Sequence, residues 1–251
     1  MTTAVQKEYN LSQARMAKLV DAPASGAGTV KGMEVRVLFR APKLIKGYFL
    51  EYLMNKINFI TSNQRKIKSL ENSLKANRLD VVVRAQNLDI MEPQFDTVQD
   101  VSRFKALKAF DILKEPVLVE DGGLSIEALN GFPGVYTKYI LKTLGADGIL
   151  KLMDGIENRF ARFISVATFI HESGEIFQFE RDDNGFEISR TKVNIQSPYA
   201  WSEFWQIIYL KEYGKTLCEL SQEEVSDFYE QTGTTGSIQK FVQWYKTKSI
   251  K

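Results

Sequence analysis

Short apolar runs alternate with longer stretches of helical spacing from residue 57 onward, and this alternation limits the possible folds more than any other feature. The runs are rich in β-branched residues and end in polar or glycine-containing segments, which is typical of strands. Between them, apolar residues such as Ile67, Leu70 and Leu74 recur at the spacing of a helix face. Strands that alternate with helices and then form a hairpin predict an α/β fold with a mixed central sheet and flanking helices. The expected elements are strands at 57–60, 79–83 and 117–119, helices through 67–74, 98–113 and 136–153, a hairpin of 160–170 with 175–180, and a mostly helical tail over 223–248, interrupted at 232–236.

The first 53 residues lack this periodicity. Segment 21–28 consists of small residues with proline and glycine, a composition typical of a linker. Three interpretations remain open: a flexible tail, a targeting segment, or translated sequence upstream of a true start at Met54, since 16–23 and 32–42 resemble the translation of a tRNA gene. We therefore divide the chain into an N-terminal extension, 1–53, and one domain, 54–251.

The charge of the chain is unevenly distributed. The net charge is +2, but residues 1–53 hold 8 basic and 4 acidic side chains, which leaves 25 basic and 27 acidic ones in the rest. A mildly acidic domain gives no reason to expect stable nucleic-acid binding. No uncharged apolar stretch is long enough to span a membrane. The single cysteine, Cys218, excludes an intramolecular disulfide framework, suits the cytoplasm, and is expected to be a small buried residue.

Three polar segments follow predicted strands, at the positions where open α/β sheets bind ligands. Segment 61–66, Thr-Ser-Asn-Gln-Arg-Lys, either cradles a phosphate at a helix N-terminus or only caps the helix. Glu120 and Asp121, followed by two glycines, come directly after the 117–119 strand. They form either a Mg²⁺ site or an ordinary acidic turn. Glu92 could join the same metal ion, although its segment is uninformative by itself.

Taken together, these segments resemble the inosine triphosphate pyrophosphatase family, whose members hydrolyse deaminated purine nucleoside triphosphates. Segment 61–66 is similar to the family's Thr/Ser-x-Asn-x-x-Lys phosphate loop, and 88–92, Leu-Asp-Ile-Met-Glu, is similar to its Leu-Asp-Leu-Pro-Glu segment. Segment 100–106 occupies the place of a helix whose lysine reaches the substrate. The longest similarity runs from 117 to 136, and the resemblance as a whole covers 56 to about 180.

The resemblance implies a two-lobed homodimer with the nucleotide in a cleft between the lobes of each chain. It implies cleavage between the α- and β-phosphates, with release of a nucleoside monophosphate and pyrophosphate. Mg²⁺ would be bound by Glu92 and Asp121, and Asp121, or Glu120 beside it, would orient or deprotonate the attacking water. The substrate-binding residues implied are Thr61, Ser62, Asn63, Lys66, Lys105, Gly122, Lys138 and Trp201. The alternatives are a nucleotide-binding regulatory protein of the same fold and a pyrophosphatase for other modified nucleotides.

The sequence departs from the family where the base is read. The family's Gly-Trp/Tyr-Asp-Pro loop is Ala-Trp-Ser-Glu at 200–203, and its Ser-His-Arg triplet has no counterpart, because 232–239 contains neither histidine nor arginine. Trp201 remains available to stack on a base, and Gln239 and Lys240 are the nearest polar substitutes. We therefore expect the phosphate chemistry to be retained and the base selectivity to be weakened or changed.

Overall fold

The computed structural model describes residues 55–181, 185–231 and 236–249. All of them belong to the second of the two units into which the chain divides, Met54–Lys251. The expectations for 1–53 and for most of the interruption in the helical tail lie outside the described residues. None of the helices in the described part combines the length and apolar composition that crossing a membrane requires.

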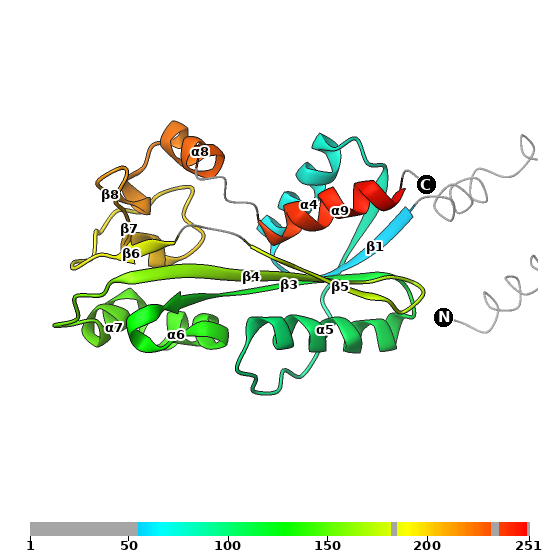
Figure 1. Ribbon diagram of the computed structural model, residues 1–251, viewed down its shortest axis with the longest axis horizontal. Coiled ribbons are helices and arrows are strands. Elements are labelled where there is room, and N and C mark those ends of the chain that lie inside the picture. The colour runs from blue at the N-terminus through cyan, green and yellow to red at the C-terminus, as the bar shows by residue number, and fades with distance from the viewer. Residues whose placement is uncertain (1–54, 182–184, 232–235, 250–251) are drawn as a thin grey trace, which may run out of the picture. The chain divides into compact units, whose positions relative to one another are not determined.

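The described part is a mixed α/β fold, as the sequence predicts (Figure 1). Its strands are β1 (Asn55–Ile60), β2 (Val81–Gln86), β3 (Val117–Ile126), β4 (Phe160–Ile170), β5 (Ile176–Glu180), β6 (Phe186–Ile188), β7 (Ile208–Leu210) and β8 (Lys215–Thr216). Its α-helices are α4 (Gln64–Ala76), α5 (Val98–Leu113), α6 (Thr137–Thr143), α7 (Gly145–Leu152), α8 (Gln222–Gln231) and α9 (Ser237–Ser249). Four short 3₁₀ turns are η1 (Glu127–Leu129), η2 (Gly134–Tyr136), η3 (Glu203–Gln206) and η4 (Leu217–Glu219).

The strands form one sheet in the order β2-β1-β3-β4-β6-β7-β8, with β5 added alongside β4. β1 runs parallel to β2 and to β3, whereas the remaining neighbours are antiparallel. β3 pairs with β4 along its whole length, from Val117 opposite Ile170 to Ile126 opposite Ala161. This long ribbon runs through both halves of the fold (Figure 1).

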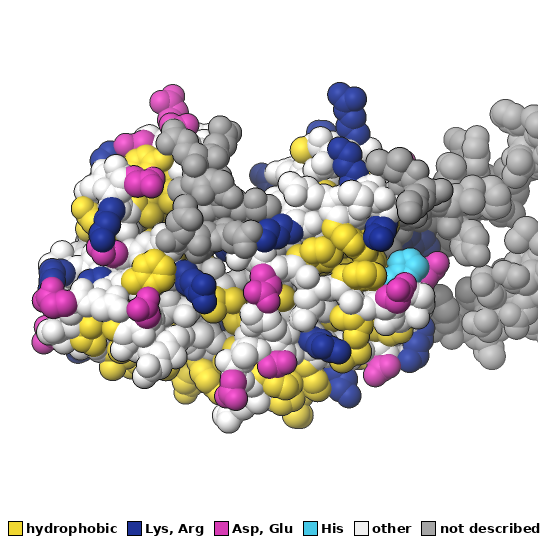
Figure 2. Space-filling model, in the orientation of Figure 1, with side chains coloured by type: hydrophobic (Ala, Val, Ile, Leu, Met, Phe, Trp, Pro, Cys, Tyr) yellow, Lys and Arg dark blue, Asp and Glu magenta, His cyan; other side chains and the backbone are white. Residues whose placement is uncertain are grey.

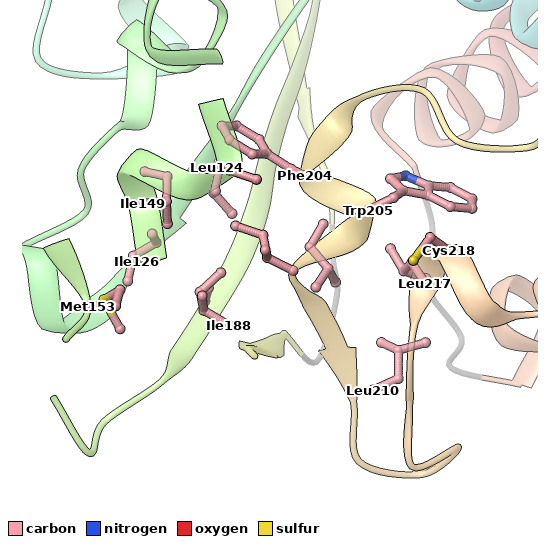
Figure 3. Packing of buried hydrophobic residues seen from close by; sticks show 14 of the residues in the cluster. Leu124, Ile126, Ile149, Met153, Ile188, Phe204, Trp205, Leu210, Leu217 and Cys218 are labelled. Atoms are coloured by element: carbon pink, nitrogen blue, oxygen red, sulfur yellow. The ribbon is translucent and has the colours of Figure 1, made fainter. Parts of the chain in front are cut away.

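Three clusters of buried apolar residues hold helices against the sheet. At the parallel end, α4 and α9 cover one face through a cluster that includes Leu70 and Phe241, and α5 covers the other through one that includes Ala106 and Ala109 (Figure 1). The third cluster lies in the other half, where α6 and α7 meet η3 and the short strands (Figure 3). Cys218 is buried in this third cluster, as expected. The two ends of the β3–β4 ribbon therefore have separate cores, which correspond to the two expected lobes.

The sequence prediction for β3 is wrong in its length. The strand was expected to end at Val119, but it continues through Glu120, Asp121 and both glycines to Ile126. The stretch continues as a strand because it pairs with β4, and its glycine is needed for close packing: a Cβ added to Gly123 would lie 2.1 Å from the carbonyl oxygen of Gly134 in η2. Gly123 therefore serves the close approach of two backbone segments rather than a turn.

Replacing Gly123 with alanine is expected to destabilise the fold by about 3 kcal/mol, because the new methyl group meets backbone atoms that cannot rotate away. Gly122→Ala is the comparison with a smaller expected loss, since its Cβ would lie 3.0 Å from Ile164 O, a tight contact that a small shift of the neighbour relieves. Urea denaturation of both variants measures the difference. Equal losses of unfolding free energy in the two variants would contradict this account.

The stretch 136–153, expected to be helical, consists of two helices. α6 ends at Thr143, and Gly145 at the start of α7 has a φ of +63°, in the left-handed region that favours glycine. An α-helix cannot continue through that conformation. The chain therefore changes direction here, which packs Ala146 and Ile149 of α7 into the core.

Candidate active site

The candidate site lies at a step in the sheet. β1 and β3 pair only at Asn58 with Val117 and at Phe59 with Leu118, because β1 ends at Ile60 while β3 continues to Ile126. The chain leaves β1 through 61–63 into the first turn of α4 at this step. The carboxyl end of β1 and the middle of β3 therefore meet where a parallel sheet presents its ligands.

Glu120 and Asp121 are adjacent on β3 and point to opposite faces of the sheet, because side chains alternate along a strand. Leu118 packs with the cluster under α4 and α9, and Val117 and Val119 pack with the cluster under α5. The alternation places Glu120 on the α4 side and Asp121 on the α5 side. Each carboxylate meets a lysine of the helix on its own side.

The loop before α4 caps the helix and also lines a cavity. The capping interpretation of 61–66 is therefore confirmed, and phosphate binding by the same loop stays a prediction. Asn63 is the N-cap, and its Oδ1 accepts hydrogen bonds from the backbone N–H groups of Arg65 at 3.0 Å and Lys66 at 3.4 Å. The Thr61 hydroxyl oxygen accepts from the Asn63 N–H at 3.1 Å. Ser62 lies exposed between them.

Glu120 belongs to a hydrogen-bonded chain that crosses the site. Its Oε2 pairs with Lys66 Nζ at 2.7 Å, and its Oε1 accepts from the Ser165 hydroxyl at 2.8 Å. The Ser165 hydroxyl is in turn 2.5 Å from the hydroxyl of Ser237, the first residue of α9. Both carboxylate oxygens of Glu120 are thus engaged, and its side chain is only 10% exposed. The chain connects α4, β3, β4 and α9.

On the other side of β3, Lys105 holds two carboxylates together. Its Nζ lies 2.7 Å from Asp121 Oδ2 and 2.8 Å from Glu92 Oε1. Burial opposes the charge on Lys105, but its contacts with Asp121 and Glu92 outweigh that effect and raise its pKa above the ordinary value. The structure therefore brings together the two expected metal ligands around one of the expected substrate lysines.

These two carboxylates fit a magnesium ion that also binds phosphate. Glu92 Oε1 and Asp121 Oδ2 both contact Lys105 Nζ, so the distance between these two oxygens cannot exceed the sum of their distances to that nitrogen. Within the described ranges, no group of three or more His, Cys, Asp or Glu side chains is arranged to hold a metal. Mg²⁺ commonly takes one or two protein carboxylates and completes its shell with phosphate oxygens and water. The donor set matches that mode and does not match a metal cage built of protein ligands alone.

A cavity of about 890 Å³ opens beside Lys66 and Glu120. The N-terminal turns of two helices face it, α4 through Asn63 and α9 through Ser237, so partly positive helix ends converge on one space. Trp201 lines another part of the wall and is 42% exposed. Its ring and that of Phe163 pack edge-on, with their centroids 4.5 Å apart. A cavity with helix N-termini, lysine and an exposed aromatic ring suits an anion that carries a flat apolar group.

Two further residues expected to bind substrate, Gly122 and Lys138, do not line the cavity. Gly122 lies exposed in β3, and its N–H donates to Asp121 Oδ1 at 3.1 Å. Lys138 is exposed on α6 and does not line the cavity.

His171, near the turn between β4 and β5, is visible at the surface in Figure 2. On the face shown there, acidic and basic side chains are interspersed rather than gathered by sign.

Several residues that line the cavity were missed at the level of sequence. They are Arg65, Ser69, Ser165, Arg181 and Ser237. Ser165 lies opposite Gly122 in the β3–β4 register, and Ser237 reaches the site only because α9 packs beside α4. Neither relation is visible in one sequence, whereas Arg65, within the polar loop, could have been included.

Comparisons with known proteins agree on one family. A family model described as the Ham1 family matches residues 57–231. The dITP/XTP pyrophosphatase of Methanopyrus kandleri is 35% identical over 193 residues, which cover 76% of this chain and 96% of that protein. That of Ignicoccus hospitalis is 41% identical over 144 residues, covering 52% and 75%. The solved Ham1 protein of Staphylococcus aureus has a TM-score of 0.64 at 20% identity, covering 77% of this chain and 100% of that one, which is a likeness of fold.

Proposed function

Because the chain belongs to the Ham1 family, we propose that it is an enzyme that hydrolyses nucleoside triphosphates to a nucleoside monophosphate and pyrophosphate. The family resemblance of its motifs is thereby confirmed. The observation that best supports the activity is the pair of lysine–carboxylate contacts on the two faces of β3, Lys66 with Glu120 and Lys105 with Asp121. A binding module has no need of a second carboxylate, Glu92, at the same lysine.

In this proposal the triphosphate lies across the step in the sheet. Lys66 and the first turn of α4, capped by Asn63, neutralise phosphate charge on one side, and Lys105 does so on the other. Phosphoryl transfer requires mainly positioning and charge neutralisation, which these fixed groups provide. Trp201 supports the base at the opposite wall of the cavity.

We assign the metal site to Glu92 and Asp121. A bound Mg²⁺ ion would neutralise negative charge on the phosphates and orient them. Lys105 holds the two carboxylates together at one nitrogen, so they are preorganised for a shared cation. The carboxylates also keep Lys105 protonated, because they raise its pKa.

We assign water activation to Asp121 rather than to Glu120. Both carboxylates have both oxygens engaged, Glu120 by Lys66 and Ser165 and Asp121 by Lys105 and its neighbour's N–H, so the assignment rests on access: the Glu120 side chain is 10% exposed against 24% for Asp121. A base must reach the proton that it removes. Glu120 therefore orients Lys66, and Asp121 accepts the proton of the attacking water.

The test is an assay of pyrophosphate release from ITP, XTP, dITP and the four common triphosphates, with Mg²⁺ and with EDTA. We expect metal-dependent release of pyrophosphate together with a nucleoside monophosphate. Nucleotide binding without release of product would instead identify a regulatory protein of the same fold. Release of inorganic phosphate and a diphosphate would contradict the proposed cleavage position.

The family resemblance also supports a homodimer that acts in the cytoplasm without a stable nucleic-acid partner. Sedimentation of the full chain tests the dimer. A monomer at the concentrations used in the assay would contradict it.

Glu92→Gln is expected to raise the Mg²⁺ concentration for half-maximal activity about tenfold, because the amide keeps the size but loses the charge that attracts the cation. Asp89→Asn is the matched control, since it removes one charge from an exposed position of the same segment. Magnesium titration of the hydrolysis rate measures both variants. A Glu92→Gln curve that coincides with that of the control would remove Glu92 from the metal site.

A further inference from the structure

One hydrogen bond joins the phosphate loop to the Trp201 loop across the cavity. Arg65 Nη1 donates to the backbone carbonyl oxygen of Ala200 at 2.8 Å, between residues 135 positions apart in the sequence. Arg65 lies between Asn63 and Lys66, and Ala200 directly precedes Trp201. Arg65 and Trp201 both line the cavity.

The same face of α4 also contacts α9, whose first turn lines the cavity. Ser69 is one helical turn after Arg65, and its hydroxyl accepts a hydrogen bond from Gln239 Nε2 of α9 at 3.3 Å. Gln239 folds back over the start of its own helix, since a Cβ added to Gly236 would lie 2.2 Å from its Oε1. One face of α4 thus contacts the Trp201 loop through Arg65 and the start of α9 through Ser69.

Trp201 is only partly held by its own ring contacts. Its ring packs edge-on against Phe163 and Trp205, at centroid distances of 4.5 and 6.3 Å, but it is 42% exposed. Ser202 caps the following turn η3 through the N–H of Phe204. The Arg65 contact fixes the backbone on the other side of Trp201, directly before it.

We propose that Arg65 is a positioning residue for the base: it holds the Trp201 loop across the cavity, so that a nucleotide bound by its phosphates at α4 finds the aromatic wall in place. This inference rests on the proposed function and adds a determinant of substrate affinity to it. Arg65 acts through the Ala200 carbonyl and Trp201, not through the phosphates. Its side chain therefore affects the binding of the nucleoside part and leaves the reacting groups at β3 unchanged.

The expected effect is a rise in KM with little change in kcat. A charge-assisted hydrogen bond at an exposed position is weakened by competition with water, so Arg65→Ala should raise KM about fivefold. Arg65→Lys should recover part of the loss, because an ammonium group can donate to the same carbonyl. Lys68→Ala is the control of matched charge, since Lys68 is exposed on α4 and does not line the cavity.

Inorganic tripolyphosphate, which has no base, separates this role from direct phosphate binding. Its inhibition constant against nucleotide hydrolysis should be the same for wild type and Arg65→Ala. A double variant with Trp201→Ala should show no further rise in KM over Trp201→Ala alone, because both changes remove the same contact with the base.

Each outcome decides between specific alternatives. An inhibition constant that rises in parallel with KM would make Arg65 a phosphate ligand and overturn the proposal, as would an Arg65→Ala variant with the KM of wild type. Fully additive effects of Arg65→Ala and Trp201→Ala would also overturn it. A wild-type protein that neither binds nor hydrolyses nucleoside triphosphates would instead refute the proposed function itself.

Discussion

Asp121→Asn is expected to lower kcat at least about a hundredfold while leaving the protein folded. Asparagine has the same shape, but it cannot accept the proton of the attacking water and gives up the charge that would bind the metal ion. Its partner Lys105 keeps Glu92 as a second counter-charge. The pair is partly exposed, so the loss of unfolding free energy should be about 1 kcal/mol or less.

Single-turnover and steady-state rates of pyrophosphate release, with circular dichroism of the unfolding transition, measure both parts of this prediction. Asp111→Asn is the control, because Asp111 is exposed on α5 and paired only at the surface with Lys114. Near-native turnover in Asp121→Asn would show that neither the base nor the metal assignment is correct. A large loss in Glu120→Gln alone would transfer the role of the base to Glu120.

The second large effect concerns the choice of base. We expect a reduced preference for ITP and XTP over ATP and GTP, with ratios of kcat/KM below about ten, or a preference for another modified base. A pocket that donates hydrogen bonds to a 6-keto purine can discriminate by about four orders of magnitude, because the wrong base leaves its polar groups unpaired. Here no arginine or histidine occupies the start of α9, and the Gln239 amide is already hydrogen-bonded to Ser69.

A panel of kcat/KM values across purine and pyrimidine triphosphates measures the selectivity. Gln239→Ala is the informative variant. Its ratios of kcat/KM between bases should change if the glutamine hydrogen-bonds the base, and should stay constant if it only packs against α4. A strong preference of the wild type for ITP and XTP over GTP would show that other groups of the cavity replace the missing donors. Trp201→Ala should lower kcat/KM for all nucleotides by a similar factor, since stacking depends little on which base is present.

The sequence predicted the elements whose limits are local. α5 was expected at 98–113 and is found at Val98–Leu113, because Thr97 caps its start and Lys114 takes a left-handed conformation at its end. β4 was likewise expected at 160–170 and is found there. Features that depend on distant partners were not predictable. The continuation of β3 through two glycines depends on its pairing with β4 and on the approach of Gly134.

The candidate site divides in the same way. The lysine–carboxylate cluster of Glu92, Lys105 and Asp121 was expected through the family motifs, and the structure brings its members together. The chain of hydroxyls from Ser165 to Ser237 was not, because serine carries no sequence signal of its own. It becomes visible only when α9, at the end of the chain, packs beside α4.

The β3–β4 ribbon has a consequence for how the domain unfolds. Both lobes build their cores on the same two strands, with Leu118 and Phe169 at one end and Leu124 and Ala161 at the other. Neither lobe can lose these strands and remain folded, so the two should melt in a single cooperative transition rather than one after the other. The amide protons of β3 and β4 should then exchange with solvent only through global unfolding. Glu120 and Asp121 should thus lie on the most slowly opening part of the described domain, so that the spacing between the two faces of the site persists through local openings elsewhere.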